Sequence, residues 1–389
     1  MKSTIPILAF AATSVLVSIN IQANDITVES LQQQIDVISQ KSNSMQAQLE
    51  SNEKSGFQLA GYASFGWSDI QNGSNNFDVV QFSPIFHYQY SNIFQFEGEL
   101  EFTVDELGKT KIELEYAAGN LFLNNYMVFV AGRFMSPVGQ FVQNIHPAWI
   151  NKMPSAPLGF GHDGASISSN VGIALRGGLP KVLNTRSNYA IFLANAPVFE
   201  QGDDGDTIIN TEGRTTSNGA SKTIGGRFAI NPLSSMEIGI SGSTGKIVET
   251  LTTGTIANSG NVNEKIQRDY NSFDVDFTYN INSLDIKAEY IRQKVGDNEL
   301  SNLEAGLWKA YYAQAAYQIT SFKLEPVIRY SNYSNPEIKS SQVALALNYL
   351  FANNVIAKVA YEINSADNQT AIAEGKDNNR MLAQLAFGF

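Results

Sequence analysis

Acidic side chains recur at every second position in two short segments of this chain. Glu97, Glu99 and Glu101 lie in the first segment, and Glu113 and Glu115 lie in the second. Successive side chains of a β-strand point to opposite faces, so this spacing puts the carboxylates of a segment on one face. Carboxylates gathered on one face attract cations. The spacing therefore predicts an acidic surface of five glutamates on two adjacent strands.

Basic side chains take comparable positions in other segments of the chain. They are Arg133, Arg176, Arg227, Lys287, Lys323 and Arg329, together with Lys111, Lys358 and Arg380. If both sets face one water-filled space, its lining carries both signs, which predicts weak ion selectivity with a modest cation bias. Two interpretations stay open. Either a field runs from the glutamates to a basic wall, or the charges simply keep the space hydrated.

Residues suited to catalysis are scarce. The chain has no cysteine and three histidines, and no Gly-x-Ser-x-Gly elbow is present. A cysteine nucleophile, a disulfide and a thiolate metal site are therefore excluded. His146 and His162 with Asp163 lack the spacing of a metal motif. We expect no enzymatic activity, no cofactor and no metal site.

Composition narrows the class of protein further. Of 389 residues, 11% are aromatic and 16% are charged, against about 25% charged in ordinary globular proteins. The formal net charge is −11, which argues against a nucleic-acid partner because binding phosphates requires a basic face. After the N-terminal region there is no run of 18 apolar residues, so we expect no transmembrane helices.

The charged positions lie in segments of about ten residues that alternate apolar with polar or small residues. This period is typical of strands with one face in lipid and the other in a wet lumen. Sixteen segments show it: 57–67, 81–90, 93–102, 109–117, 121–134, 165–177, 186–195, 221–231, 235–244, 270–279, 284–294, 307–319, 321–331, 339–351, 354–364 and 380–389. Long and short connections alternate between them. We therefore predict an all-β fold, a 16-stranded antiparallel transmembrane β-barrel in the bacterial outer membrane.

The N-terminal region follows different rules. Lys2, an apolar stretch and Ile21-Gln22-Ala23 are typical of a signal peptide over residues 1–23. Residues 24–55 show apolar spacings of three and four, which predict a short α-helical coiled coil in the periplasm, favouring a trimer. A lone amphipathic helix is the alternative. The barrel is then expected over residues 56–389.

Two stretches around the fifth predicted strand resemble a known family. Gly132-Arg133-Phe134-Met135-Ser136-Pro137-Val138-Gly139 and His146-Pro147-Ala148-Trp149-Ile150 are similar to the strand-to-loop region of the porin O/porin P (phosphate-selective) family. The barrel plan resembles general and sugar-specific trimeric porins, some of which carry an N-terminal coiled coil. The resemblance implies a homotrimeric porin through which small hydrophilic solutes or ions diffuse passively. The dense Arg and Lys ladders of phosphate-selective porins are absent from this chain.

The same resemblance gives the connection over residues 135–164 a role. In sixteen-stranded porins the loop at this position folds inward and narrows the channel. The candidate residues of this constriction loop are His146, Trp149, Lys152, His162 and Asp163.

The expected surroundings are outer-membrane lipid and lipopolysaccharide. A second function stays open, in which the barrel is a surface protein. The long loops 196–220 and 245–269 would then bind an external partner, as in an adhesin or a phage receptor.

Overall fold

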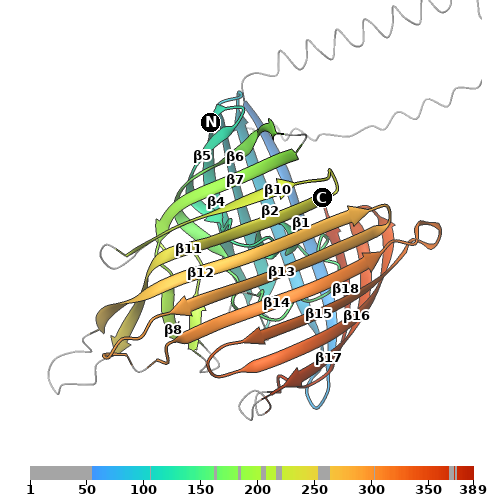
Figure 1. Ribbon diagram of the computed structural model, residues 1–389. Helices are drawn as coiled ribbons and strands as arrows, with labels where there is room; N and C mark the ends of the chain where they lie inside the picture. The colour runs from blue at the N-terminus through green and yellow to red at the C-terminus, as the bar shows by residue number, and fades with distance from the viewer. Residues whose placement is uncertain are drawn as a thin grey trace, which may run out of the picture. The chain divides into compact units, whose positions relative to one another are not determined.

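The chain folds into one antiparallel sheet that closes on itself (Figure 1). The computed structural model describes residues 55–105, 107–161, 164–182, 185–202, 207–215, 221–252, 263–301, 303–367, 372 and 375–389. The predicted signal peptide lies outside these residues, and so does the predicted coiled coil apart from Ser55. Ser55 is the first residue of β1.

The elements follow one another in a simple order. They are β1 (Ser55–Ile70), β2 (Asn75–Tyr90), β3 (Phe94–Val104), β4 (Thr110–Asn124), β5 (Met127–Met135), the π-helical turn η1 (Phe141–Ile145), β6 (Ser169–Val182), β7 (Thr185–Asn195), β8 (Val198–Gln201), β9 (Thr207–Asn210), β10 (Lys222–Asn231), β11 (Met236–Thr252), β12 (Asn263–Ile281), β13 (Leu284–Val295), β14 (Gly306–Tyr317), the 3₁₀ turn η2 (Thr320–Phe322), β15 (Leu324–Ser334), β16 (Lys339–Ala352), β17 (Val355–Ala366) and β18 (Arg380–Gly388). Within the described ranges no helix is long and apolar enough to cross a membrane.

Sixteen of these strands, β1–β7 and β10–β18, form the barrel wall. β1 pairs with both β2 and β18, and β7 pairs with β10, so the ladder has no open edge. Closure is required in lipid, because an open edge would leave backbone groups without hydrogen-bond partners. β8 and β9 form a hairpin within the connection from β7 to β10. The predicted sixteen-stranded antiparallel barrel is confirmed.

The two faces of the wall differ as the alternation predicts. In β16, Leu345 and Leu347 are 48% and 49% exposed, whereas Ala344 and Ala346 between and beside them are buried. Such exposed apolar residues recur around the barrel, for example Phe82, Ile191 and Ile328. A continuous apolar exterior is stable only against lipid, so the outward face is the membrane-contacting face.

Two turns differ from their predicted positions. The predicted turn at 118–120 is part of β4, and the chain turns instead after Asn124, whose Oδ1 accepts a hydrogen bond of 2.8 Å from the Tyr126 N–H. A side chain that bonds the backbone two residues later stabilises a turn locally, and alternation alone does not reveal it. The turn predicted at Thr320 alone takes residues 318–323, because η2 occupies it.

Several strands extend into segments predicted as long loops. β11 reaches Thr252 and β12 begins at Asn263, so much of the predicted loop 245–269 is strand. The two segments pair residue by residue from Gly245 with Tyr270 to Thr252 with Asn263. Their polar residues weaken the alternation of apolar and polar side chains, but backbone pairing between neighbours needs no apolar face.

The carboxyl terminus lies at the seam between the first and last strands. The Phe389 N–H donates to the Gly61 carbonyl at 2.9 Å, and the Gly61 N–H donates to the Phe389 carbonyl at 3.0 Å. The Phe389 ring also stacks on Phe82 of β2, with centroids 5.9 Å apart. The last residue thus joins β18 to β1 and β2.

We expect Phe389→Ala to lower the free energy of unfolding by about 1 kcal/mol, because the aromatic contact is lost. Urea titration of the refolded barrel, followed by tryptophan fluorescence, would measure this. Phe77→Ala is the control, since Phe77 is 89% exposed and has no ring partner in the described part of the chain. Equal effects of the two substitutions would show that the seam contact contributes nothing specific.

Candidate functional site: the passage through the barrel

The connection from β5 to β6, residues 136–168, folds into the barrel and binds the far wall. The Gly139 N–H donates to Ser241 Oγ of β11 at 3.0 Å, and the Leu158 N–H donates to Ser331 Oγ of β15 at 3.3 Å. Lys152 Nζ lies 2.7 Å from Glu325 Oε1. These contacts span sequence separations of 100 residues or more. The inward-folding loop implied by the family resemblance is present.

A buried carboxylate holds the start of this loop. Glu289 of β13 accepts the Gln140 N–H on Oε1 and the Phe141 N–H on Oε2, each at 2.9 Å. These amides lie at the beginning of η1, where backbone N–H groups have no partner within the helix. A charged acceptor on two such groups makes strong hydrogen bonds. Glu289 therefore fixes the point at which the loop meets the wall.

Two buried cations hold the later part of the loop. Arg329 donates to the carbonyls of Ser155 and Ala156 at 2.8 and 3.1 Å. Lys358 donates to the carbonyls of Ala148 and Met153. Loop carbonyls left in a dry interior need donors, and these side chains supply them. The charges of Arg329 and Lys358 therefore serve the loop.

Aromatic packing closes the space between the loop and this wall. Phe141 and Phe160 of the loop meet Tyr312 of β14 edge to face, with ring centroids 5.9 and 5.0 Å apart. On the outer side, Phe199 of β8 packs on Trp308 at 5.5 Å, so the β8–β9 hairpin joins the same apolar cluster. This half of the lumen is filled, which leaves open space on the side of β1–β4.

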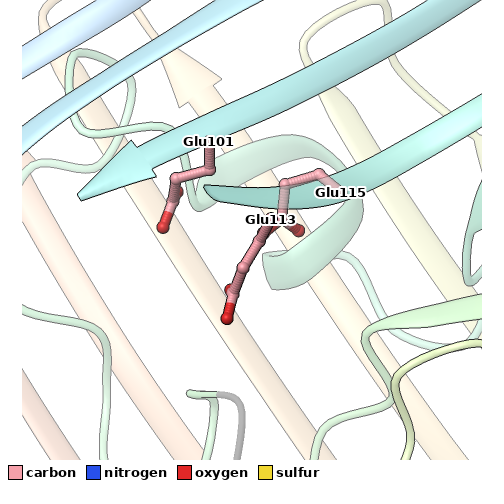
Figure 2. Close-up of side chains that lie close together, drawn as sticks. All are labelled: Glu101, Glu113 and Glu115. Atoms are coloured by element: carbon pink, nitrogen blue, oxygen red, sulfur yellow. The ribbon is translucent and has the colours of Figure 1, made fainter. Parts of the chain in front are cut away.

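Three carboxylates form the surface across that space. Figure 2 shows Glu101 of β3 beside Glu113 and Glu115 of β4, and one carboxylate oxygen of each lies within 4.8 Å of the others. Glu101 pairs directly with Glu113, and a register shift at Glu99 and Leu100 places Glu115 beside them. Like charges directly opposite each other are destabilising, so a cation that enters between them is favoured.

The carboxylates border two cavities. A cavity of about 240 Å³ lies between Glu101, Glu115 and the loop residues Phe141, Val142 and Phe160. A larger cavity of about 870 Å³ contains Glu101, Glu113 and residues of the β8–β9 hairpin in its lining. Glu101 lines both, so the narrow space between the loop and the acidic wall opens into the wider one.

The other two predicted glutamates have partners within the wall. Glu99 is buried and accepts a hydrogen bond of 2.8 Å from the Tyr62 hydroxyl. Glu97 accepts from Asn120 at 3.0 Å and lies 3.3 Å from Arg176. Of the five glutamates, three thus form the exposed acidic cluster and two are held by neighbours.

The predicted basic wall lies mostly beneath the loop and does not border the open passage. Arg227 is bound between Asp276 and Glu237, and Lys287 is bound to Asp285. Arg329 is fully buried, with Glu362 at 3.7 Å. Burial in water-poor surroundings requires a partner for each charge, and the wall and loop provide it.

Three other predicted positions also differ from a pore wall. Lys323 is exposed in the turn after η2, one residue before β15 begins. Arg133 alternates with the buried Val130 and Phe134, and its Nε donates to Ser169 Oγ at 3.1 Å. Arg176 is half-exposed beside Glu97.

The predicted loop residues have structural contacts. His146 Nδ1 contacts the Val142 carbonyl, and its ring meets Tyr62 edge to face. Trp149 packs against Gly388 of β18, where an added Cβ would lie 2.9 Å from the indole. Lys152 binds Glu325. His162 and Asp163 lie outside the described residues.

The groups that hold the loop were missed as site residues. They are Glu289, Glu325 and Glu362, with Ser155 and Phe141 on the loop. Alternation alone places these glutamates on inward faces, because Glu289 lies between outward Ala288 and Tyr290. A strand pattern identifies the face, but it does not reveal which distant loop residue the side chain meets.

A closed sixteen-stranded antiparallel barrel with an apolar exterior, an inward loop and an acidic passage defines an outer-membrane porin. In sequence, residues 213–389 match the model of the family phosphate-selective porin O and P. No curated protein matches the chain. The chain is an outer-membrane porin that resembles the phosphate-selective porins over its second half.

Solved structures share this fold at low sequence identity. Salmonella typhi OmpF in complex with daunomycin is 16% identical, with a TM-score of 0.57 over 87% of this chain and 99% of that chain. The anion-selective porin from Comamonas acidovorans is 10% identical, with a TM-score of 0.55 over 86% and 100%. The trimer form of Vibrio cholerae OmpT is 11% identical, with a TM-score of 0.53 over 87% and 100%.

We expect Glu289→Ala to release the start of the loop, because two backbone N–H groups lose their acceptor. The free energy of unfolding should fall by about 2–4 kcal/mol, and single-channel conductance should become larger or noisier. Planar-bilayer recording and urea titration would measure both. Glu299→Ala, at an exposed loop position, is the control. Unchanged conductance noise and stability in Glu289→Ala would contradict the anchoring role.

Proposed function

We propose that this porin conducts small hydrophilic solutes and ions passively and prefers cations. The observation that carries the proposal is the cluster of Glu101, Glu113 and Glu115 at the edge of the narrow passage. One lysine is bound there, since Lys111 Nζ lies 2.5 Å from Glu113. Three carboxylates against one ammonium leave the passage with an acidic surplus.

The proposed preference is a property of the lining and is independent of the fold. The Comamonas porin is anion-selective by its title and shares this fold at 10% identity. The matching family is described as phosphate-selective. In this chain Arg227, Arg329 and Lys358 are buried, so they leave little positive charge for an anion in the passage. Rings of acidic side chains favour cations in other channels.

The assembly and surroundings follow the same proposal. We assign no catalytic step to the chain, because His87 and His146 contact Glu97 and the loop backbone. A homotrimer is supported by the trimer form of a structural neighbour. The apolar exterior supports contact with outer-membrane lipid, and the cationic outer rim supports contact with lipopolysaccharide.

The alternative of a surface-binding barrel receives less support. The connection 196–220 contains the β8–β9 hairpin, in which the Thr207 carbonyl accepts the Trp308 indole N–H at 3.3 Å. Thr207 Oγ1 also donates to Glu337 at 2.7 Å. A hairpin packed onto the wall and into the lumen shapes the channel entrance and leaves fewer groups available to an external partner.

The triple variant Glu101→Gln/Glu113→Gln/Glu115→Gln tests the cation preference. At about 4 Å one charge contributes roughly 1 kcal/mol even in water. We therefore expect the cation-to-anion permeability ratio to fall on the order of fivefold. The reversal potential of the reconstituted channel in a potassium chloride gradient measures this ratio.

A matched control removes three acids from the outer connection between β13 and β14. Asp297→Asn/Glu299→Gln/Glu304→Gln changes the net charge equally at exposed positions, and its reversal potential should equal that of the wild type. Anion preference in the wild type, or an unchanged potential in the Glu101 triple variant, would refute the proposal. Channel closure in three steps would support the trimer.

A further inference from the structure

Three cations face outward at the outer ends of two adjacent strands. Arg292 and Lys294 of β13 alternate with the buried Ile291, Gln293 and Val295, so they point away from the lumen. Lys309 of β14 lies between the buried Trp308 and Ala310, and it too points outward. We call Arg292, Lys294 and Lys309 the outer basic patch.

The register brings these like charges together. Arg292 pairs directly with Lys309 across the β13–β14 ladder. Lys294 lies two positions further along the same face of β13. Cations directly opposite each other on one face of a sheet are destabilising unless an anion lies between them. The arrangement therefore favours binding of an anionic group.

No acidic side chain in the described part of the chain pairs with the patch. The adjacent outward carboxylate, Asp269 of β12, is bound by Lys246 at 2.5 Å. Arg292 instead lies over the Phe273 ring, with its guanidinium carbon 5.5 Å from the centroid. The ring orients the guanidinium and does not neutralise its charge.

The patch lies near the outer boundary of the apolar band. From Leu284, the first residue of β13, to Lys294 there are ten steps, which at roughly 3.3 Å each and a tilt of about 45° rise about 23 Å. The apolar band of such barrels is about 25 Å tall. Tyr290 and Tyr311 precede the patch on the same outward face, and tyrosine favours this boundary.

We propose that the outer basic patch binds the phosphate groups of a phosphorylated glycolipid in the outer leaflet. The phosphate oxygens accept from Arg292 and Lys309 together, and Lys294 adds a further charge. The lipid chains then lie along the apolar face below, beside Tyr290 and Tyr311. The inference rests on the proposed lipopolysaccharide contact and is independent of the ion preference, because none of the three cations faces the lumen.

Binding of bisphosphorylated lipid A to purified, delipidated full-length protein tests the proposal. Native mass spectrometry in detergent would compare the wild type with Arg292→Gln/Lys294→Gln/Lys309→Gln. Each surface cation near anionic lipid contributes roughly a fivefold change in affinity, so the triple variant should bind on the order of a hundredfold more weakly. Lipid A without phosphates should bind both proteins weakly and equally.

Single substitutions supply the matched control. Lys309→Gln should weaken binding about fivefold, whereas Lys323→Gln, which removes the same charge at the opposite rim, should have no effect. The single variants keep the test valid if the triple variant does not fold. The conductance and reversal potential of Lys309→Gln should equal those of the wild type, so failure here is distinct from failure of the cation preference.

Three results would overturn the proposal. The first is equal lipid A binding by the wild type, Lys309→Gln and the triple variant. The second is binding of inorganic phosphate as tight as that of lipid A, which would make a free anion the ligand. The third is a loss of the oligomer in the triple variant with unchanged lipid A binding, which would assign the patch to a second copy of the chain.

Discussion

Lipid cannot form hydrogen bonds with the backbone, and this constraint determines the rest of the structure. Every strand must pair on both sides, so the sheet closes and β1 meets β18. Closure with an apolar exterior leaves polar side chains on the inner face, where Glu289, Arg329 and Lys358 lie. These buried charges need partners, and the amides and carbonyls of the inward loop meet that need. The loop and the charged wall therefore stabilise each other.

The same pairing separates the charges of the lumen. Basic side chains on the β10–β17 side are bound to acids or to the loop, whereas Glu101, Glu113 and Glu115 remain beside open space. Of the two interpretations open at the sequence level, a field between opposed walls fits poorly, because burial beneath the loop removes the basic wall from the passage. The balance of charge along the chain is thus a poor guide to the charge that a solute meets.

Much of the fold could be predicted from the sequence because the membrane imposes a period on every strand. Alternation identified all sixteen wall strands and the shared face of Glu101 and Glu113. It missed the turn at Asn124, which depends on one side-chain hydrogen bond. It could not identify Glu289 as an anchor, since that role depends on loop residues about 148 positions away in sequence. Contacts of such long range have no local pattern.

The position of the passage is the central claim, and the absence of native cysteine permits a direct test. Thr103 lines the open cavity beside the acidic wall, whereas Ser331 is buried beneath the loop. A charged thiol-reactive reagent applied during bilayer recording should reduce the conductance of Thr103→Cys and leave that of Ser331→Cys unchanged. Rapid block of Ser331→Cys with no effect on Thr103→Cys would place the passage on the other side of the loop and contradict the account.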